Sequence, residues 1–203
     1  MGLLQIVLAA LLTAGGLGTT TAASGTFTPG GGPAVNFVGS DISFTDVQAN
    51  QTLTCAQVNF AGTVIDPASS RALGENAGTL DNLSTSNCTN PLGGLTNVTL
   101  LGTPKVSITG QPAGTRWPAE LADVSAQITV AGCSFTVEGD VTGVFDTATQ
   151  TVTPTANSLK IIGDPVGYLC PIPGLAKDQT FRVSGSWTNV PPAGSDPLTF
   201  TSP

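Results

Sequence analysis

Short segments of alternating residues, divided by glycine and proline turns, constrain the fold of this chain more than any other feature. The 203 residues include 25 glycines and 15 prolines. Turn sequences such as "GSD", "IDPASS", "TGQPAG", "EGD", "GDP" and "PPAG" recur at short, fairly even intervals. Many short strands at such spacing are typical of a sandwich or a barrel. We expect an all-β fold, an antiparallel β-sandwich with two similar halves, closed by disulfides.

The alternation predicts strands rather than helices along the whole chain. In "TFRVSGSWT" the residues Phe181, Val183 and Trp187 share one face, so Trp187 is expected in the core. Residues 71–83, "RALGENAGTLDNL", are the only candidate for a helical turn, and two glycines argue against it. The expected strands cover residues 34–38, 42–45, 52–64, 96–101, 106–109, 124–130, 134–137, 141–145, 150–153, 158–162, 180–188 and 198–201.

Four cysteines, Cys55, Cys88, Cys133 and Cys170, indicate disulfides. No Cys-x-x-Cys pair and no histidine is present, so the usual ligand spacing of a zinc site is missing. Four cysteines allow three pairings. We favour Cys55–Cys88 and Cys133–Cys170, because residues 50–110 and 124–190 read as a faint duplication. In each half a cysteine opens an alternating run, such as "CSFTVEGDVTGVF", and a second cysteine precedes proline and then Gly-Leu.

The N-terminus predicts export. Residues 3–16, "LLQIVLAALLTAGG", form an apolar run too short to span a bilayer. Small residues at Thr21-Ala22-Ala23 fit a signal-peptidase site before Ser24, although no Lys or Arg precedes the apolar run. We therefore expect a signal peptide at 1–23 and a single secreted, all-β domain at 24–203, with no membrane span in the mature chain. Export also supplies the oxidising compartment that disulfides require.

Charge excludes one class of partner. Only 9% of the residues are charged and the net charge is −7. The six cations are spread along the chain without a cluster, whereas a nucleic-acid binder needs a basic surface to neutralise phosphates. We expect no nucleic-acid partner, and anionic membrane surfaces are disfavoured for the same reason. The surface must instead be formed by Thr, Ser, Asn and Gln.

Catalytic candidates are few. Without histidine, a Ser-His-Asp or Cys-His arrangement and a His-ligated metal are ruled out. Carboxylates such as Glu138 and Asp140 remain, but many acids stand at turns, where they have a structural role. We predict no catalytic residue, no metal site and no cofactor.

One candidate binding site is the segment "GTRWPAE", which is interpreted as a loop with an exposed Trp117 beside Arg116. The alternative is that Trp117 caps the end of the sandwich.

These observations favour a secreted binding or structural module at a cell surface or in an extracellular assembly. One alternative is a hydrolase of extracellular polysaccharide that uses paired carboxylates. Another is an inhibitor of a secreted protease, with the loop "CPIPGLAK" from Cys170 as the inhibitory segment. Few lysines guard the many expected strands, so partners are expected to be a second copy of the chain, through strand edges, or another surface protein.

The combination of export signal, two pairs of cysteines, "GDVTGVF" and a closing "FRVSGSWT" resembles small secreted proteins of actinomycete bacteria. That group is mostly of unknown function. The resemblance covers most of residues 50–190 and implies a two-disulfide, all-β secreted domain. It implies no catalytic residue.

Overall fold

The computed structural model describes residues 25–203, which contain strands and turns and no helix. The predicted signal peptide, residues 1–23, lies outside this described part. No helix among residues 25–203 is long and apolar enough to cross a membrane. The described strands are β1 (Thr26–Gly32), β2 (Ala34–Asp46), β3 (Gln51–Val64), β4 (Arg71–Ala72), β5 (Asn76–Thr89), β6 (Thr96–Leu100), β7 (Lys105–Ile108), β8 (Arg116–Val130), β9 (Cys133–Asp146), β10 (Thr151–Asn157), β11 (Lys160–Val166), β12 (Phe181–Ser184), β13 (Trp187–Asn189) and β14 (Asp196–Thr201).

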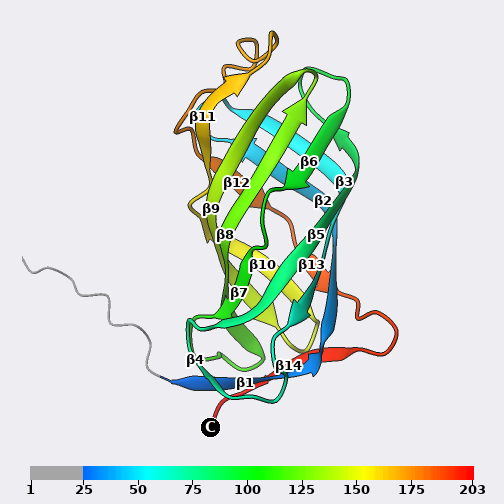
Figure 1. Cartoon of the computed structure of the whole chain (residues 1–203), viewed down its shortest axis with the longest axis vertical. Coiled ribbons are helices and arrows are strands. Elements are labelled where there is room, and N and C mark those ends of the chain that lie inside the picture. The colour runs from blue at the N-terminus through cyan, green and yellow to red at the C-terminus, as the bar shows by residue number, and fades with distance from the viewer. Residues whose placement is uncertain (1–24) are drawn as a thin grey trace, which may run out of the picture.

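Eight of these strands close into a barrel. The antiparallel ring runs β8, β9, β10, β13, β2, β3, β5, β7 and returns to β8. Three further strands extend one end, which is the upper end in Figure 1. There β6 pairs with β8, β11 with β9, and β12 with β2. Because this ring is closed by backbone hydrogen bonds, its strands do not end in two free sheet edges.

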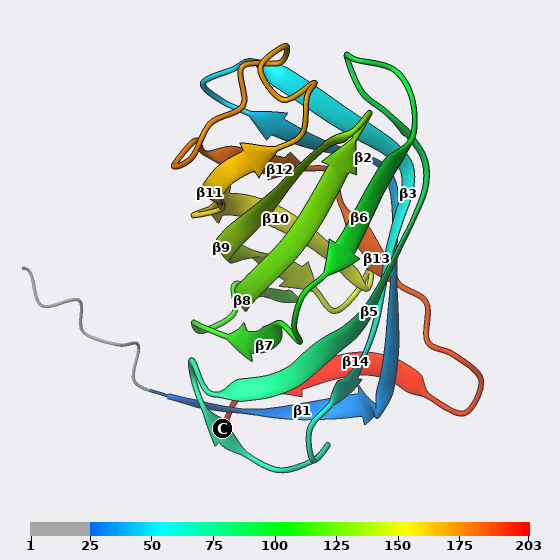
Figure 2. The same ribbon diagram turned by 45° about the horizontal axis from the view of Figure 1, so that its top comes forward.

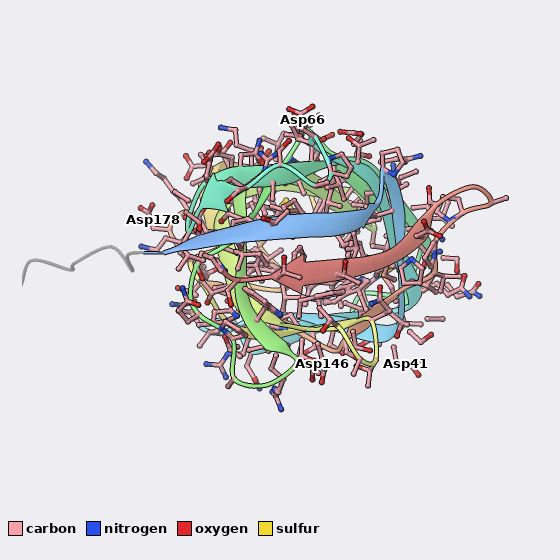
Figure 3. All side chains as sticks on the ribbon, turned by 90° about the horizontal axis from the view of Figure 1, so that it is seen from below. Asp41, Asp66, Asp146 and Asp178 are labelled. Carbon is pink, nitrogen blue, oxygen red and sulfur yellow. A yellow bond between two sulfur atoms is a disulfide. The ribbon has the colours of Figure 1, made fainter. Side chains whose placement is uncertain are left out.

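The opposite, lower end of the barrel is crossed by a small separate sheet. Its strand order is β14, β1, β4, and Thr28 of β1 pairs with Thr201 of β14. Figure 2 shows β1 and β14 beneath the barrel, and Figure 3, seen from below, shows them side by side across its opening. The first and the last strands of the described chain therefore close one end of the barrel together.

The long strands bend at mid-length and change neighbours there. In β9, residues 134–138 pair with β11 and residues 141–146 pair with β10, with Gly139 between them at φ 142°. In β8, the register against β9 shifts between Leu121 and Val124, next to Asp123 at φ 57°. Such bulges bend a strand and re-aim its side chains. The upper and lower halves of the barrel thus have different strand neighbours.

The all-β class and the two disulfides are confirmed, and the predicted sandwich is corrected to a barrel. The physical reason is that β7 and the pair β10–β13 hydrogen-bond across the sides that a sandwich would leave open. Two smaller expectations also change. The "CSFTVEGDVTGVF" segment is one bent strand rather than two strands joined by a turn. Residues 71–83, the only helical candidate, lie in β4, in β5 and in the turn between them.

The core consists of two hydrophobic clusters, one in each half of the barrel. The upper cluster includes Ile42, Ile128, Ile161 and Trp187, and the lower cluster includes Phe27 and other apolar residues near β1 and β14. Three side chains, Phe37, Phe60 and Val152, pack against both clusters. The burial predicted for Trp187 is confirmed, since 6% of its surface is exposed and its indole Nε1 donates a hydrogen bond to the Val58 carbonyl at 2.8 Å.

Both predicted disulfides are present with the favoured pairing. Cys55 on β3 is bonded to Cys88 directly opposite it on β5. Cys133, the first residue of β9, is bonded to Cys170 in the loop between β11 and β12. The first bond joins neighbouring strands, whereas the second fastens a loop to the upper end of the barrel. The two bonds therefore differ in what they hold, and the duplication that suggested the pairing stays a prediction.

Hydroxyl side chains cover much of the outer face, as the low charge predicted. Pairs lie opposite each other on neighbouring strands, including Ser43 with Thr54 at 3.2 Å and Thr45 with Thr52 at 3.0 Å between their oxygens. Cross-strand hydroxyl pairs of this kind stabilise a sheet modestly. Lys105–Asp123 at 2.8 Å is the only salt bridge among residues 25–203.

Candidate functional site

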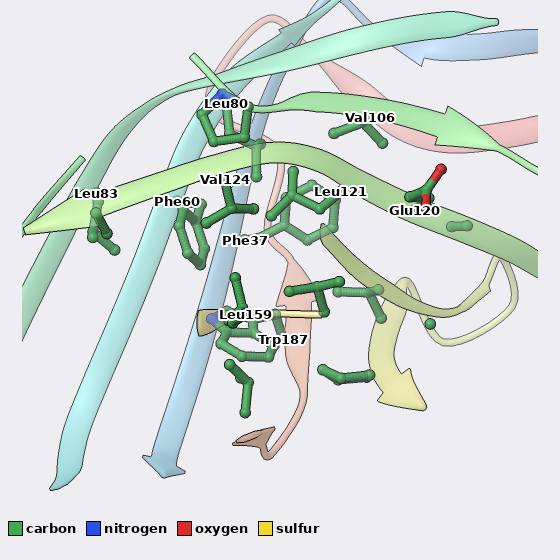
Figure 4. Close-up of a pocket in the computed structure, with 18 of the residues that line it drawn as sticks. Phe37, Phe60, Leu80, Leu83, Val106, Glu120, Leu121, Val124, Leu159 and Trp187 are labelled. Carbon is green, nitrogen blue, oxygen red and sulfur yellow. The ribbon is translucent and has the colours of Figure 1, made fainter. Parts of the chain in front are cut away.

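An apolar cavity of about 170 Å³ lies inside the barrel, between the two core clusters. Side chains from both clusters contribute to its wall, for example Ile128 from the upper one and Phe145 from the lower one. Figure 4 shows Phe37, Phe60 and Trp187 around this space. A barrel of eight strands has an interior just wide enough to be filled by side chains or to hold one small ligand. In this barrel the side chains leave part of the interior free.

The wall of the cavity contains almost no polar chemistry. Every residue in the wall is apolar except Glu120. Strand alternation places the Glu120 side chain on the outer face of β8, because its neighbours Ala119 and Leu121 are the inward residues. The one polar atom of the wall's aromatic rings, Trp187 Nε1, already donates to Val58. A bound molecule would therefore find apolar surface and no free hydrogen-bonding side chain.

The bends of the long strands account for the position of the cavity. Leu121 and Val124 stand on either side of the bulge in β8, and Val141 follows the Gly139 bend in β9. All three side chains line the cavity and are only partly buried. One cluster fills the upper half of the barrel and the other fills the lower half. Free space remains between the two clusters, at the level where the strands bend.

The lower end of the cavity is closed by β14. Leu198 and Phe200 line the cavity, and the Phe200 ring packs against Phe27, Trp117 and Phe145 with ring centroids 5.6–6.1 Å apart. These contacts are edge-to-face, an arrangement that aromatic rings favour. The sheet that crosses the lower end is therefore held by an aromatic cluster, not only by its backbone hydrogen bonds.

A second, smaller cavity of about 40 Å³ lies at the upper end. It is lined by Leu92 from the loop before β6 and by Pro173 and Leu175 from the loop that Cys170 fastens. Phe181 and Phe135 also line it, and their rings are tilted at 41° to each other with centroids 5.4 Å apart. These two loops therefore cover the upper end of the barrel.

The predicted pair Arg116 and Trp117 does not form an exposed platform. Trp117 is 4% exposed, lies in β8 rather than in a loop, and packs into the lower aromatic cluster. It matches the alternative interpretation, a tryptophan that caps the end of the fold. Arg116 is exposed and lies opposite Asp146. The pKa of Asp146 is lowered mainly by a side-chain hydrogen bond with Thr115 and by the Ala148 N–H, with a smaller contribution from Arg116. A binding role for this pair stays a prediction.

No carboxylate of residues 25–203 points into the cavity: Glu120 faces outward, and the buried Asp46 accepts the N–H groups of Gln48 and Ala49 through Oδ1. Asp140 Oδ1 accepts the Asp123 N–H at 3.0 Å, and Asp123 accepts from Lys105, which raises the lysine pKa through the hydrogen bond and the opposite charge. Glu138 accepts from Ser125 Oγ at 3.1 Å. Among the described residues no group of three or more His, Cys, Asp or Glu is placed to hold a metal. Paired carboxylates in a cleft lined by Trp117, which the hydrolase hypothesis needs, are found in neither cavity.

Sequence reasoning did not predict the cavity. Its wall consists of the same alternating apolar residues that predict an ordinary packed core. The only related signal was the presence of turn-forming residues in mid-strand, at 39–41 and 138–140. The proposed inhibitory loop "CPIPGLAK" begins at the buried Cys170 and exposes Ile172, which is 66% exposed. Protease inhibition by this loop stays a prediction.

The fold and the cavity define an eight-stranded, disulfide-linked barrel with an apolar interior site. No protein-family model matches this chain, and the searches of curated proteins and of solved structures gave no match. The resemblance to small secreted actinomycete proteins therefore stays an expectation, and the function is argued from the residues of the site itself.

Proposed function

We propose that this protein is a secreted, non-catalytic binding protein that takes a small apolar molecule into the interior of its barrel. The observation that carries the proposal is the cavity of about 170 Å³ with its wholly apolar inner wall. Two disulfides are consistent with the oxidising environment of an exported protein.

The volume limits the size of the ligand. An engineered cavity of about 150 Å³ lined by Leu, Ile and Phe stays dry and binds benzene. Sites for drug-sized ligands usually measure roughly 300–1,000 Å³. At about 170 Å³ the present cavity fits a molecule of one aromatic ring with a short substituent or a compact aliphatic of similar size. Longer chains and fused polycyclic molecules would require the lining to move.

The chemistry of the wall limits polarity. A hydroxyl group placed in an apolar cavity without a partner costs about 1–3 kcal/mol. Phe37, Phe60 and Val124 offer only van der Waals contacts. We therefore expect toluene to bind roughly ten- to a hundredfold more tightly than phenol, a molecule of nearly equal size. Calorimetric titration of each compound into the disulfide-intact protein measures this ratio.

A variant that fills the cavity tests the location of the site. Val124→Phe adds a ring beside the free space, so we expect toluene binding to weaken by roughly tenfold or more. Val141→Phe fills the cavity from β9 and serves as the second filling variant if Val124→Phe does not fold. Val190→Phe is the matched control, because Val190 is 50% exposed in the loop before β14. Equal toluene affinity in the wild type and in a folded filling variant would contradict the proposed site.

A further inference from the structure

Four large apolar side chains are strongly exposed at the upper end of the barrel. Leu95 is 91% exposed, Tyr168 83%, Val166 73% and Ile172 66%. Leu95 lies in the loop before β6, whereas the other three lie within seven residues, at the end of β11 and in the loop that follows it. We call these four side chains the apolar tip. Single exposed apolar residues need no explanation, but a group of them marks an interaction surface.

Contacts with one hairpin turn place three residues of the apolar tip near each other, and the fourth, Ile172, lies two residues after Cys170, which is bonded to Cys133 at the start of β9. The turn between β8 and β9 consists of Ala131 and Gly132. The Ala131 N–H donates to the Leu95 carbonyl at 3.1 Å. On the other side, Cε1 of Tyr168 lies 3.5 Å from the position that a Cβ on Gly132 would occupy. Val166 pairs with Ser134, two residues beyond the turn. Figure 1 shows the two loops flanking this hairpin at the upper end.

The loop that carries Tyr168 and Ile172 is held in place rather than left free. The Cys133–Cys170 disulfide fixes it to β9 between these two residues. Within the loop, the Cys170 N–H donates to the Gly167 carbonyl at 3.3 Å and the Ile172 N–H to the Leu169 carbonyl at 3.1 Å. Prolines at 171 and 173 restrict the backbone further. The exposure of these side chains is therefore built into the fold.

The segments that carry the apolar tip contain no charged residue, while Asp164, Lys177 and Asp178 flank the longest of them. Residues 90–96, 130–134 and 165–176 contain no Asp, Glu, Lys or Arg. A surface that binds anionic lipid uses clustered Lys and Arg, and a protein interface is usually rimmed by polar or charged residues. An uncharged projection of Leu, Val, Ile and Tyr fits the boundary region of a neutral lipid layer, where the amphipathic Tyr ring is favoured.

We propose that the apolar tip inserts into the surface of an uncharged, zwitterionic lipid layer. A second copy of the chain is a poorer occupant, because a stable dimer buries about 800 Å² on each partner with roughly 20–30 residues a side. The four tip residues at the convex end of the barrel are far fewer than that. Shallow insertion into lipid needs only such a small projecting group. The inference does not rest on the cavity or on its ligand.

Co-sedimentation with vesicles of pure phosphatidylcholine tests the proposal. We expect the disulfide-intact protein to sediment with the vesicles. In the variant Leu95→Asp/Tyr168→Asp the partition coefficient should fall by roughly tenfold or more for each side chain changed. The matched control is Leu101→Asp/Val190→Asp, which places the same charges at residues that are 53% and 50% exposed but lie outside the tip. The control should sediment like the wild type.

A fluorescent reporter gives an independent measurement. Both native tryptophans are buried, so Ile172→Trp adds an exposed indole whose emission should shift to shorter wavelength when vesicles are added. Val190→Trp should show no shift.

Absence of wild-type sedimentation, equal loss of sedimentation in the control variant, or a requirement for anionic lipid would each overturn the proposal. Dimers by light scattering that vanish in Leu95→Asp/Tyr168→Asp would identify a second copy as the occupant and overturn it as well. Val124→Phe should still bind vesicles, which separates this test from that of the cavity.

Discussion

Gly39 in β2 faces the indole ring of Trp187, and the contact leaves no room for a side chain. A Cβ at this position would lie 2.5 Å from Trp187 Nε1 and 2.6 Å from its Cδ1. The indole cannot move away without loss of its hydrogen bond to Val58, at 2.8 Å. Trp187 also lines the cavity. The absence of a side chain at Gly39 therefore gives the Trp187 indole the space that it occupies in the cavity wall.

Gly39→Ala tests this contact. We expect the free energy of unfolding to fall by about 2–4 kcal/mol, from overpacking and from disturbance of a buried hydrogen bond. Urea unfolding followed by tryptophan fluorescence measures the change. Gly102→Ala is the control, because a Cβ at Gly102 would meet nothing within 4 Å. Equal stability of the two variants would show that the indole tolerates the extra methyl group.

At the scale of the strands, the sequence predicted type well and connection poorly. The alternating residues of "TFRVSGSWT" indicated the buried Trp187, and the segments from 52–64 and 96–101 correspond closely to β3 and β6. By contrast, "GSD" at 39–41 and "EGD" at 138–140 were interpreted as turns but lie inside β2 and β9. Gly and Asp tolerate the backbone angles of both a turn and a bulge. Local sequence does not distinguish them, because the difference depends on which distant strands pair on either side.

The candidate site was beyond prediction for the same reason. Val124 and Val141 are the first residues of two expected strands, and Leu121 lies before the first of these strands. They line a cavity only because β8 and β9 bend together and exchange partners at that level. Of the two interpretations of Trp117, the exposed binding residue is wrong and the capping tryptophan matches the structure. The pairing of Trp117 with Phe145 makes "GTRWPAE" part of a strand and turns the indole inward.

Removal of each disulfide is expected to have a different effect on the local structure. Their sequence separations, 33 and 37 residues, are nearly equal. Loop entropy alone therefore predicts a similar loss of stability, about 3–4 kcal/mol for each. Cys55→Ser/Cys88→Ser leaves two strands that are still paired on both sides of the lost bond. Cys133→Ser/Cys170→Ser releases the loop after β11 from its covalent attachment.

Limited proteolysis and amide hydrogen exchange distinguish the two double variants. We expect cleavage and faster exchange at residues 167–176 only in Cys133→Ser/Cys170→Ser. Urea unfolding of both variants measures the shared loss of stability. If Cys55→Ser/Cys88→Ser exposes the same loop equally, the Cys133–Cys170 bond is not what specifically holds the loop, and this assignment is wrong.

For the whole molecule, ring closure changes the expectation of self-association through strand edges. Outside the ring, five of the described strands pair on one side only, namely β4, β6, β11, β12 and β14. Of these, β11 and β14 each contain an Asp-Pro pair, Asp164-Pro165 and Asp196-Pro197. Proline removes a backbone donor and charge discourages pairing, so these two edges are guarded. We retain the prediction of association but expect it to be weak. Light scattering should show monomers at low concentration and dimers only at high micromolar protein. A strict monomer throughout would contradict it.

The pairing of β1 with β14 has a consequence for the order of assembly. This pairing joins residues near position 28 to residues near position 201, so it connects segments separated by most of the described residues. Because synthesis proceeds from the N-terminus, β1 is made long before β14 is available to pair with it. The lower end of the barrel can therefore close only after β14 has been synthesised, late in the assembly of the fold.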